Sequence, residues 1–148
     1  DQVALKEMRR VLNPDGLLAL SVWGLAEEVP LVETALSCMR RLLPPPKVAR
    51  PSIFRFGDAD ELERRIASAE FCEIEIRPCR FTTRFGDAGA YWQGFLDLAG
   101  GAAESLSRLP AEKQQALAVA VAEELAPYAV TGGFELTSTV LVAAARPV

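Results

Sequence analysis

Leu17 to Trp23 has the sequence LLALSVW, a nearly continuous apolar run that Gly24 ends. Apolar runs of this length, without a polar residue at every second position, are typical of strands covered on both faces within a parallel sheet. The preceding Asn13-Pro14-Asp15-Gly16 has Asn, Pro and Gly at the positions that a type I turn favours. The sequence therefore predicts an interior strand that follows a sharp turn.

The rest of the chain alternates between helical and extended patterns. Apolar residues at helical spacing predict helices over residues 2–12, 30–42, 58–69, 87–99 and 110–126, the fourth ending at Gly100-Gly101. Asp58 and Asp87 are predicted to cap the third and fourth of these helices. Residues 44–57 begin with three prolines and are expected to form a loop. Two further strands are predicted over residues 72–81 and 135–145. The order of these elements is typical of an α/β fold.

The two later strands differ in how much of their surface is apolar. Ile74 and Ile76 alternate with charged residues, and Pro78 lacks the N–H that a central strand needs, so residues 72–81 are expected at a sheet edge. Residues 135–145 are apolar on both faces and are expected at the centre. Three strands make a poor sheet when the first has no neighbour along one edge. We therefore predict a homodimer paired along Leu17–Trp23, or a missing N-terminal half of the protein beside this strand.

Composition limits the class of protein. A chain of 148 residues that is 50% hydrophobic is sufficient for one core, and we predict a single domain over residues 1–148. Sixteen basic and twenty acidic residues give a net charge of −4, which argues against nucleic-acid binding. The sequence has no apolar run long enough for a membrane span and no signal-peptide pattern, so we predict a cytoplasmic protein without membrane contact.

The residues that usually carry catalysis or bind metals are scarce. The chain has no histidine, which excludes histidine as a general base or metal ligand within it. The three cysteines form no CxxC pair, so neither a disulfide framework nor a zinc site is predicted. No metal-binding residue is assigned.

Three segments resemble class I S-adenosylmethionine-dependent methyltransferases, which have a Rossmann-like fold. EMRRVLNPDGLLALSVWG, Glu7 to Gly24, resembles the helix, turn and fifth strand of that family, although Asp15 stands where the family usually has glycine. AEFCEIEI, Ala69 to Ile76, resembles the approach to the sixth strand, and ELTSTVLVAAARP, Glu135 to Pro147, resembles the seventh. The resemblance implies three strands in the order five, seven, six, with the seventh antiparallel and with covering helices.

The resemblance also implies what the chain lacks. The family binds S-adenosylmethionine at a glycine-rich turn after its first strand, and this sequence contains no such turn. It begins at Asp1 and leads directly into a helical pattern, which favours a C-terminal, substrate-side part that is inactive alone. No catalytic or cofactor-binding residue is assigned, and whether the chain is an enzyme by itself stays open. S-adenosylmethionine is expected in the full-length enzyme, with a small-molecule methyl acceptor.

Three aromatic residues are candidates for the acceptor pocket. Residues 24–57 and 82–134 resemble the segments that cover the acceptor in this family. Trp23 ends its predicted strand, and Tyr91 and Trp92 lie in the second covering segment, so each is a candidate pocket wall. The competing interpretation is that aromatic residues at helical spacing belong to the core.

Two other functions remain open. A non-catalytic dimerising or small-molecule-binding module would pair two copies along Leu17–Trp23 and so complete a sheet. A nucleic-acid binder would use the basic stretch Cys38–Gly57, which contains Arg40, Arg41, Lys47, Arg50 and Arg55 and no acidic residue. Such a stretch is more often a solvated face, and nucleic-acid binding is not the prediction.

Overall fold

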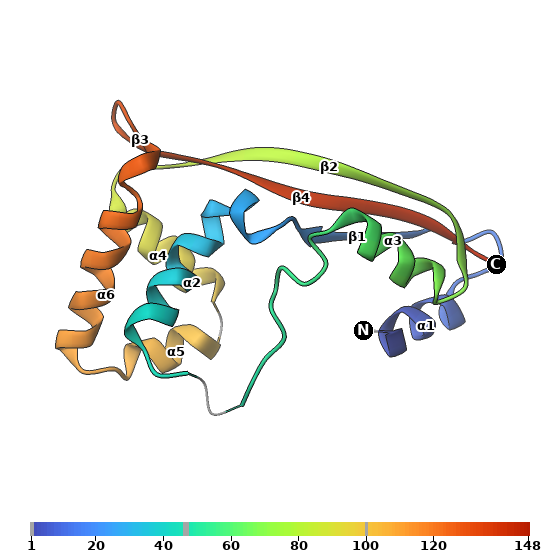
Figure 1. Cartoon of the computed structure of the whole chain (residues 1–148), viewed down its shortest axis with the longest axis horizontal. Coiled ribbons are helices and arrows are strands. Elements are labelled where there is room, and N and C mark those ends of the chain that lie inside the picture. The colour runs from blue at the N-terminus through green and yellow to red at the C-terminus, as the bar shows by residue number, and fades with distance from the viewer. Residues whose placement is uncertain (1, 46–47, 100) are drawn as a thin grey trace. The chain divides into compact units, whose positions relative to one another are not determined.

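The computed structural model describes residues 2–45, 48–99 and 101–148 as a mixed α/β fold (Figure 1). Its helices are α1 (Gln2–Val11), α2 (Pro30–Leu42), α3 (Ala59–Ala67), α4 (Ala88–Leu98), α5 (Gly101–Ser107) and α6 (Ala111–Glu124). The 3-10 turns are η1 (Ala26–Glu28) and η2 (Ala126–Tyr128). The strands are β1 (Leu18–Trp23), β2 (Phe71–Phe85), β3 (Ala129–Val130) and β4 (Gly133–Pro147).

The strands form one sheet in the order β1-β4-β2. β4 is antiparallel to β1, with a register that runs from Leu18 opposite Ala145 to Trp23 opposite Val140. The central position of the last strand, its antiparallel direction and the edge position of the second strand are therefore confirmed among the described residues. The prediction of three strands was incomplete, because the short β3 also pairs with β4. A two-residue strand is too short to leave a periodic pattern in the sequence.

The chain folds into two compact units, which are described separately. The first contains the residues up to Val29, Arg50–Phe81 and Thr139–Val148. The second contains Pro30–Ala49 and Thr82–Ser138. β2 and β4 contribute residues to both units because both boundaries fall within these strands.

The core of the first unit lies between its sheet and the two helices α1 and α3 (Figure 1). α3 begins as predicted, with the Asp58 side chain accepting a hydrogen bond from the Glu61 backbone N–H at 2.8 Å. Its apolar stripe presents Leu62 and Ile66 to the sheet. The fully or largely buried residues of this core are Leu18, Leu62, Ile66, Ala69, Phe71, Leu141, Ala143 and Ala145.

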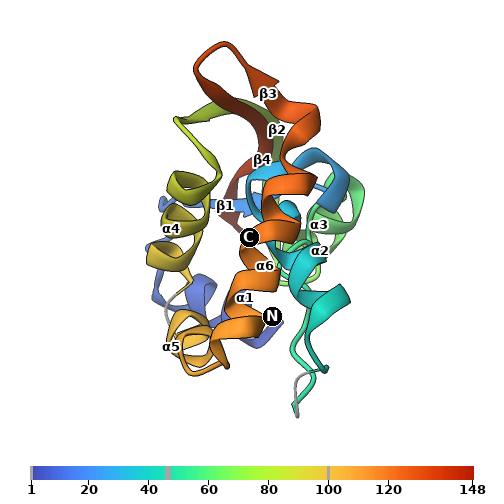
Figure 2. The same cartoon turned by 90° about the vertical axis from the view of Figure 1, so that its left-hand side faces the viewer.

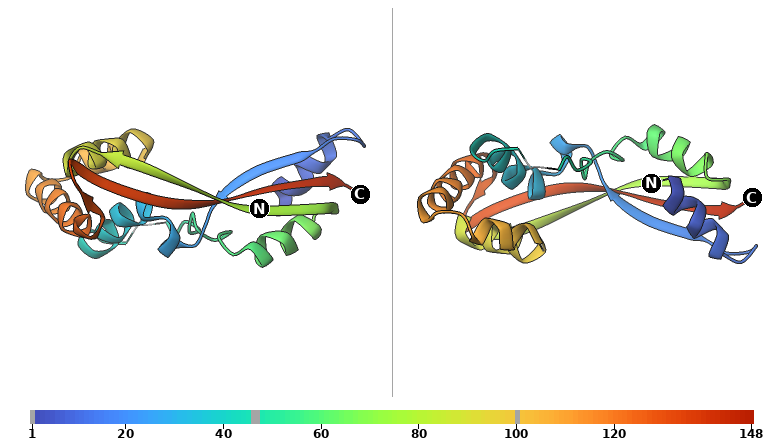
Figure 3. Two further views of the ribbon diagram at one scale, coloured as in Figure 1. Left: turned by 90° about the horizontal axis from the view of Figure 1, so that it is seen from above. Right: turned by 90° about the horizontal axis from the view of Figure 1, so that it is seen from below.

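Only one face of β1 is covered, so the predicted burial of both faces is wrong for the described part of the chain. Leu18 is buried and Leu20 and Val22 are half-buried against the core, whereas Ala19 and Ser21, on the opposite face, are exposed. Figure 3 shows β1 alongside β4 from two opposite directions. The apolar pattern shows that both faces are suited to burial, but burial also requires a covering element, and α1 and α3 both pack on the same side.

The core of the second unit is formed by helices that pack around α6 (Figure 2). α6 contacts both α2 and α4. Asp87 caps α4 as predicted, accepting a hydrogen bond from the Ala90 backbone N–H at 2.7 Å. The largest side chains of this core with almost no exposed surface are Tyr91, Leu117, Val121, Leu125 and Leu136.

Two sequence predictions fail in the second unit. The helical spacing predicts that Leu98 shares one stripe with Tyr91 and Phe95, but Leu98 is 84% exposed, because it is the last residue of α4. The break predicted at Gly100-Gly101 falls partly on Gly100, which lies outside the described residues. Gly101 begins α5, a helix that the sequence pattern did not predict.

Candidate functional site

The first unit has an apolar sheet surface opposite its core, which we name the open face. Residues of β1 and β4 that alternate with the core residues point to this side. The open face consists of Ala19, Ser21, Trp23, Phe81, Val140, Val142 and Ala144. Val142 is 43% exposed at the centre of this surface. A valine at this exposure on a central strand indicates a surface suited to further packing.

Trp23 lies at the carboxyl end of β1 on the open face, opposite Val140 of β4. It is half-buried, and its ring centroid lies 6.3 Å from that of Phe81, with the planes tilted by 38°. Such a tilted pair is a favourable aromatic contact. Trp23 therefore has a fixed neighbour on β2 and still exposes part of its indole.

A hollow of about 550 Å³ lies on the β2 side of the open face. Val142 and Ala144 of β4 form its apolar part. Its other lining residues belong to β2: Glu75, Arg77, Pro78, Cys79 and Arg80. The Arg77 guanidinium is paired with the Glu75 carboxylate, so the charges at its border partly compensate each other.

β1 also leaves one edge unpaired. β4 pairs with one side of β1, and no strand in the described ranges pairs with the other side. Unpaired N–H and C=O groups along such an edge accept a further strand. The first unit therefore combines an unpaired edge and an apolar face on the same strand.

Tyr91, the second candidate for the acceptor pocket, is a core residue of the second unit with 1% exposure. Its hydroxyl donates to the Leu31 carbonyl oxygen at 3.0 Å and accepts from the Ala35 backbone N–H at 3.1 Å. These two backbone groups are one turn apart on α2. Burial raises the pKa of the Tyr91 phenol. The residue holds α2 against α4 and presents no surface to a ligand.

Replacing Tyr91 with phenylalanine should lower the free energy of unfolding by about 1–2 kcal/mol, because two buried hydrogen bonds to α2 are lost while the ring remains. Urea denaturation measures the change. Tyr128→Phe is the matched control, since Tyr128 is half-buried in the same unit and makes no side-chain hydrogen bond to a described residue. Equal stability of Tyr91→Phe and the wild type would show that the hydroxyl does not hold α2.

Trp92, the third candidate, follows Tyr91 on α4 but has a different environment. It is half-buried and stacks on Phe95, with ring centroids 5.7 Å apart and planes within 15°. The consecutive positions turn the two side chains in different directions around the helix. Of the two, Trp92 retains surface that a ligand could contact.

The basic stretch Cys38–Gly57 is partly neutralised within the structure. Arg40 pairs with Glu33, and Arg41 pairs with Glu124 at 2.7 Å. The Arg55 guanidinium lies 4.5 Å from the centre of the Phe56 ring. Lys47 lies outside the described residues. Arg40 and Arg41 are thus paired with carboxylates of the same unit.

Cysteines and acidic residues form no metal-binding cluster of three or more among the described residues. Cys38 is buried in the second unit, and burial raises the pKa of its thiol. Cys72 and Cys79 are exposed on β2. A buried thiol with a raised pKa is poorly suited to nucleophilic chemistry.

Sequence reasoning missed two residues that make defined contacts, Phe81 and Ser138. Phe81 lies against Trp23, but its position in a half-buried pattern on β2 carried no sign of that contact. Ser138 is fully buried, and its hydroxyl accepts a hydrogen bond from the Leu31 backbone N–H at 3.3 Å. A serine within an apolar strand was the available signal, because a buried hydroxyl requires a partner.

No helix in the described part of the chain is both long and apolar enough to cross a bilayer. In comparisons with known proteins, no protein-family model matches the chain and no curated protein matches it.

Proposed function

We propose that this chain is the C-terminal, substrate-side part of an S-adenosylmethionine-dependent class I methyltransferase that acts on a small-molecule acceptor. The observation that carries the proposal is the state of β1, which is apolar on both faces but has one bare edge and one bare face. The strand order β1-β4-β2, with β4 antiparallel to β1, agrees with the order that the resemblance implies.

The missing contacts of β1 indicate what the rest of the protein supplies. One further strand would satisfy the unpaired edge, and one helix would cover the open face. Together they are the elements that a doubly wound sheet places beside such a strand. An N-terminal half of a methyltransferase sheet provides both, and it also provides the glycine-rich turn.

The described residues do not fit S-adenosylmethionine by themselves. Ligands of open α/β sheets bind at the carboxyl ends of strands near the point where the strand order reverses. The glycine-rich turn that binds the cofactor in the family has no counterpart in this sequence. S-adenosylmethionine supplies the methyl group when it is bound to the whole enzyme, and no residue of this chain is assigned to it.

The chain's own contribution is to the acceptor. Trp23 is the last residue of β1 and exposes part of its indole. Ligands of open α/β sheets bind at the carboxyl ends of strands, which is where Trp23 lies. We assign Trp23 to the acceptor wall. A wall of this kind orients the acceptor and excludes water from the transfer, which are the main tasks of the protein in methyl transfer.

The isolated chain is expected to bind S-adenosylmethionine too weakly for detection by isothermal titration calorimetry, because it lacks the turn that contacts the cofactor. A micromolar dissociation constant for the 148-residue chain would contradict this placement of the cofactor site.

Expression of the longer gene product provides the positive arm of the same test. The gene sequence upstream of residue 1 should encode a strand followed by a glycine-rich turn, and the longer product should bind S-adenosylmethionine. In a Trp92→Phe background, Trp23 fluorescence should be quenched by acrylamide in the isolated chain and protected in the longer product. An upstream sequence without this turn, together with a dimer by light scattering, would favour the dimerising module instead.

A further inference from the structure

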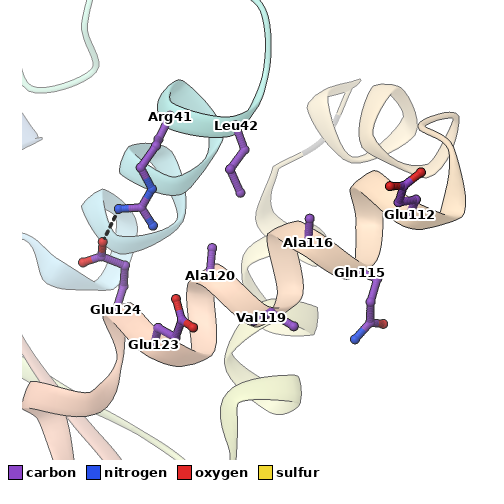
Figure 4. Close-up of a pocket in the computed structure, with 9 residues that line it drawn as sticks. All are labelled: Arg41, Leu42, Glu112, Gln115, Ala116, Val119, Ala120, Glu123 and Glu124. Atoms are coloured by element: carbon purple, nitrogen blue, oxygen red, sulfur yellow. Dashed lines mark hydrogen bonds and ion pairs between the residues drawn. The ribbon is translucent and has the colours of Figure 1, made fainter.

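The second unit contains a groove of about 850 Å³ beside α6, which we name the α2–α6 groove (Figure 4). Two of its lining residues, Arg41 and Leu42, lie at the end of α2. The others lie along α6: Glu112, Gln115, Ala116, Val119, Ala120, Glu123 and Glu124. The groove is distinct from the open face and belongs to a different unit.

The floor of the α2–α6 groove is apolar. Ala116 and Ala120 point from α6 toward the end of α2, and Leu42 extends toward them (Figure 4). Leu42 is 40% exposed, and Val119 beside them is 47% exposed. Small side chains on α6 next to an exposed leucine leave room for side chains of another molecule.

The rim of the groove carries an excess of negative charge. Arg41 donates to the Glu124 carboxylate at 2.7 Å, and this hydrogen bond raises the pKa of Arg41. Glu112 and Glu123 form no ion pair with any described residue, and both are exposed. Arg41 also attracts the Glu123 carboxylate, but one guanidinium offsets only one of three negative charges, so Glu112 and Glu123 stay available to a partner.

The two available carboxylates lie at opposite ends of the groove (Figure 4). They lie eleven positions apart on one helix, at positions 112 and 123. With a rise of about 1.5 Å per residue, they are about 16 Å apart along the axis. This spacing is too long for one compact cation and fits two basic residues three turns apart on a second helix.

We propose that the α2–α6 groove docks a basic amphipathic helix of a partner protein. The partner's apolar stripe lies over Ala116, Ala120 and Leu42, and its basic residues pair with Glu112 and Glu123. A small molecule would remain largely exposed on a groove whose lining side chains are mostly solvent-exposed. A second copy of the same surface is excluded as the partner because its carboxylates would face those of the first.

The test uses two labelled helical peptides and fluorescence anisotropy on the whole chain. The first peptide has leucines along one stripe and two lysines eleven residues apart, and the second has glutamates in place of the lysines. The lysine peptide should bind, and its affinity should fall as salt concentration rises. The glutamate peptide should not bind. No binding of the lysine peptide, or equal binding of both peptides, overturns the proposal.

Two variants separate charge from shape. The double variant E112Q/E123Q should weaken the lysine peptide by about tenfold, the combined effect of two surface ion pairs of up to about 1 kcal/mol each. The matched control E27Q/E63Q removes two exposed carboxylates of the first unit and should leave binding unchanged. Equal losses in both double variants would show attraction to net charge alone and overturn the site.

Ala116→Phe tests the floor of the groove. Ala116 is exposed, so a phenylalanine fills the groove without entering the core, and circular dichroism should show the helical content of the wild type. Peptide affinity should fall at least as far as in E112Q/E123Q. Unchanged affinity in a folded Ala116→Phe variant would place the peptide elsewhere and overturn the proposal.

Discussion

Replacing Ile66 with alanine should lower the free energy of unfolding by about 2–5 kcal/mol, the range for deleting a buried branched side chain that leaves a cavity. Ile66 has no exposed surface and lies on the face of α3 that packs against the sheet of the first unit. Its neighbours in this core include Leu62, Phe71 and Leu141. They are attached to a helix and to two different strands, so they cannot close the cavity by moving together.

Ile53→Ala provides the matched control for this prediction. Ile53 belongs to the same unit but is 43% exposed in the segment before α3. The same atoms are removed, and the expected loss is below about 1 kcal/mol because little apolar surface returns to water. Both variants are measured by urea denaturation monitored by circular dichroism. Equal losses for Ile66→Ala and Ile53→Ala would show that Ile66 is not part of a packed core.

Local signals in the sequence predicted most of the helices and strands. Asp58 and Asp87 each precede a helix and cap it as expected, because a short carboxylate side chain reaches the backbone N–H three residues later. The apolar run at Leu17–Trp23 predicted a strand, and the structure begins it one residue later. These features depend only on residues close together in the sequence and on the regular spacing of apolar residues within one helix or strand.

Features that depend on distant residues were predicted less well. Tyr91 was a candidate pocket wall. Its hydroxyl instead forms hydrogen bonds with backbone groups of α2, at Leu31, 60 residues earlier in the chain, and at Ala35, 56 residues earlier. Helical spacing does not distinguish a core aromatic from a pocket aromatic. The α2–α6 groove was missed for the same reason, since nothing in the sequence placed Leu42 beside the glutamates of α6.

The strand order was within reach of sequence reasoning because each strand differs in how much burial it tolerates. Pro78 favoured an edge for β2, and the apolar residues on both faces of β4 favoured the centre. Covering both faces of β1 was also implied by its composition, but the covering element is not among the described residues. The residues of a strand therefore indicate which of its faces and edges need to be covered, and the structure shows which of them the described residues cover.

Gly57→Ala should destabilise the first unit by about 3 kcal/mol, at the upper end of what overpacking a core costs. A Cβ on Gly57 would overlap the carbonyl carbon and oxygen of Gly24 and would lie 2.6 Å from the Leu25 nitrogen. All of these are backbone atoms, and the Gly24 N–H is itself bonded to the Thr139 carbonyl oxygen at 3.0 Å. Neither side of the contact has a flexible side chain that could move away.

The matched control for Gly57→Ala is Gly86→Ala, where an added Cβ meets nothing within 4 Å. Both substitutions replace glycine with alanine and so reduce the conformational entropy of the unfolded chain by a similar amount. The unfolded state therefore contributes similarly to the stability change of each variant. Gly86→Ala should therefore be neutral or slightly stabilising, and the difference between the two variants isolates the contact with Gly24. Because Gly24 ends β1 and Gly57 precedes the cap of α3, this difference measures how closely the strand and the helix must approach. Equal stability of the two variants in urea denaturation would contradict the close approach of the two glycines.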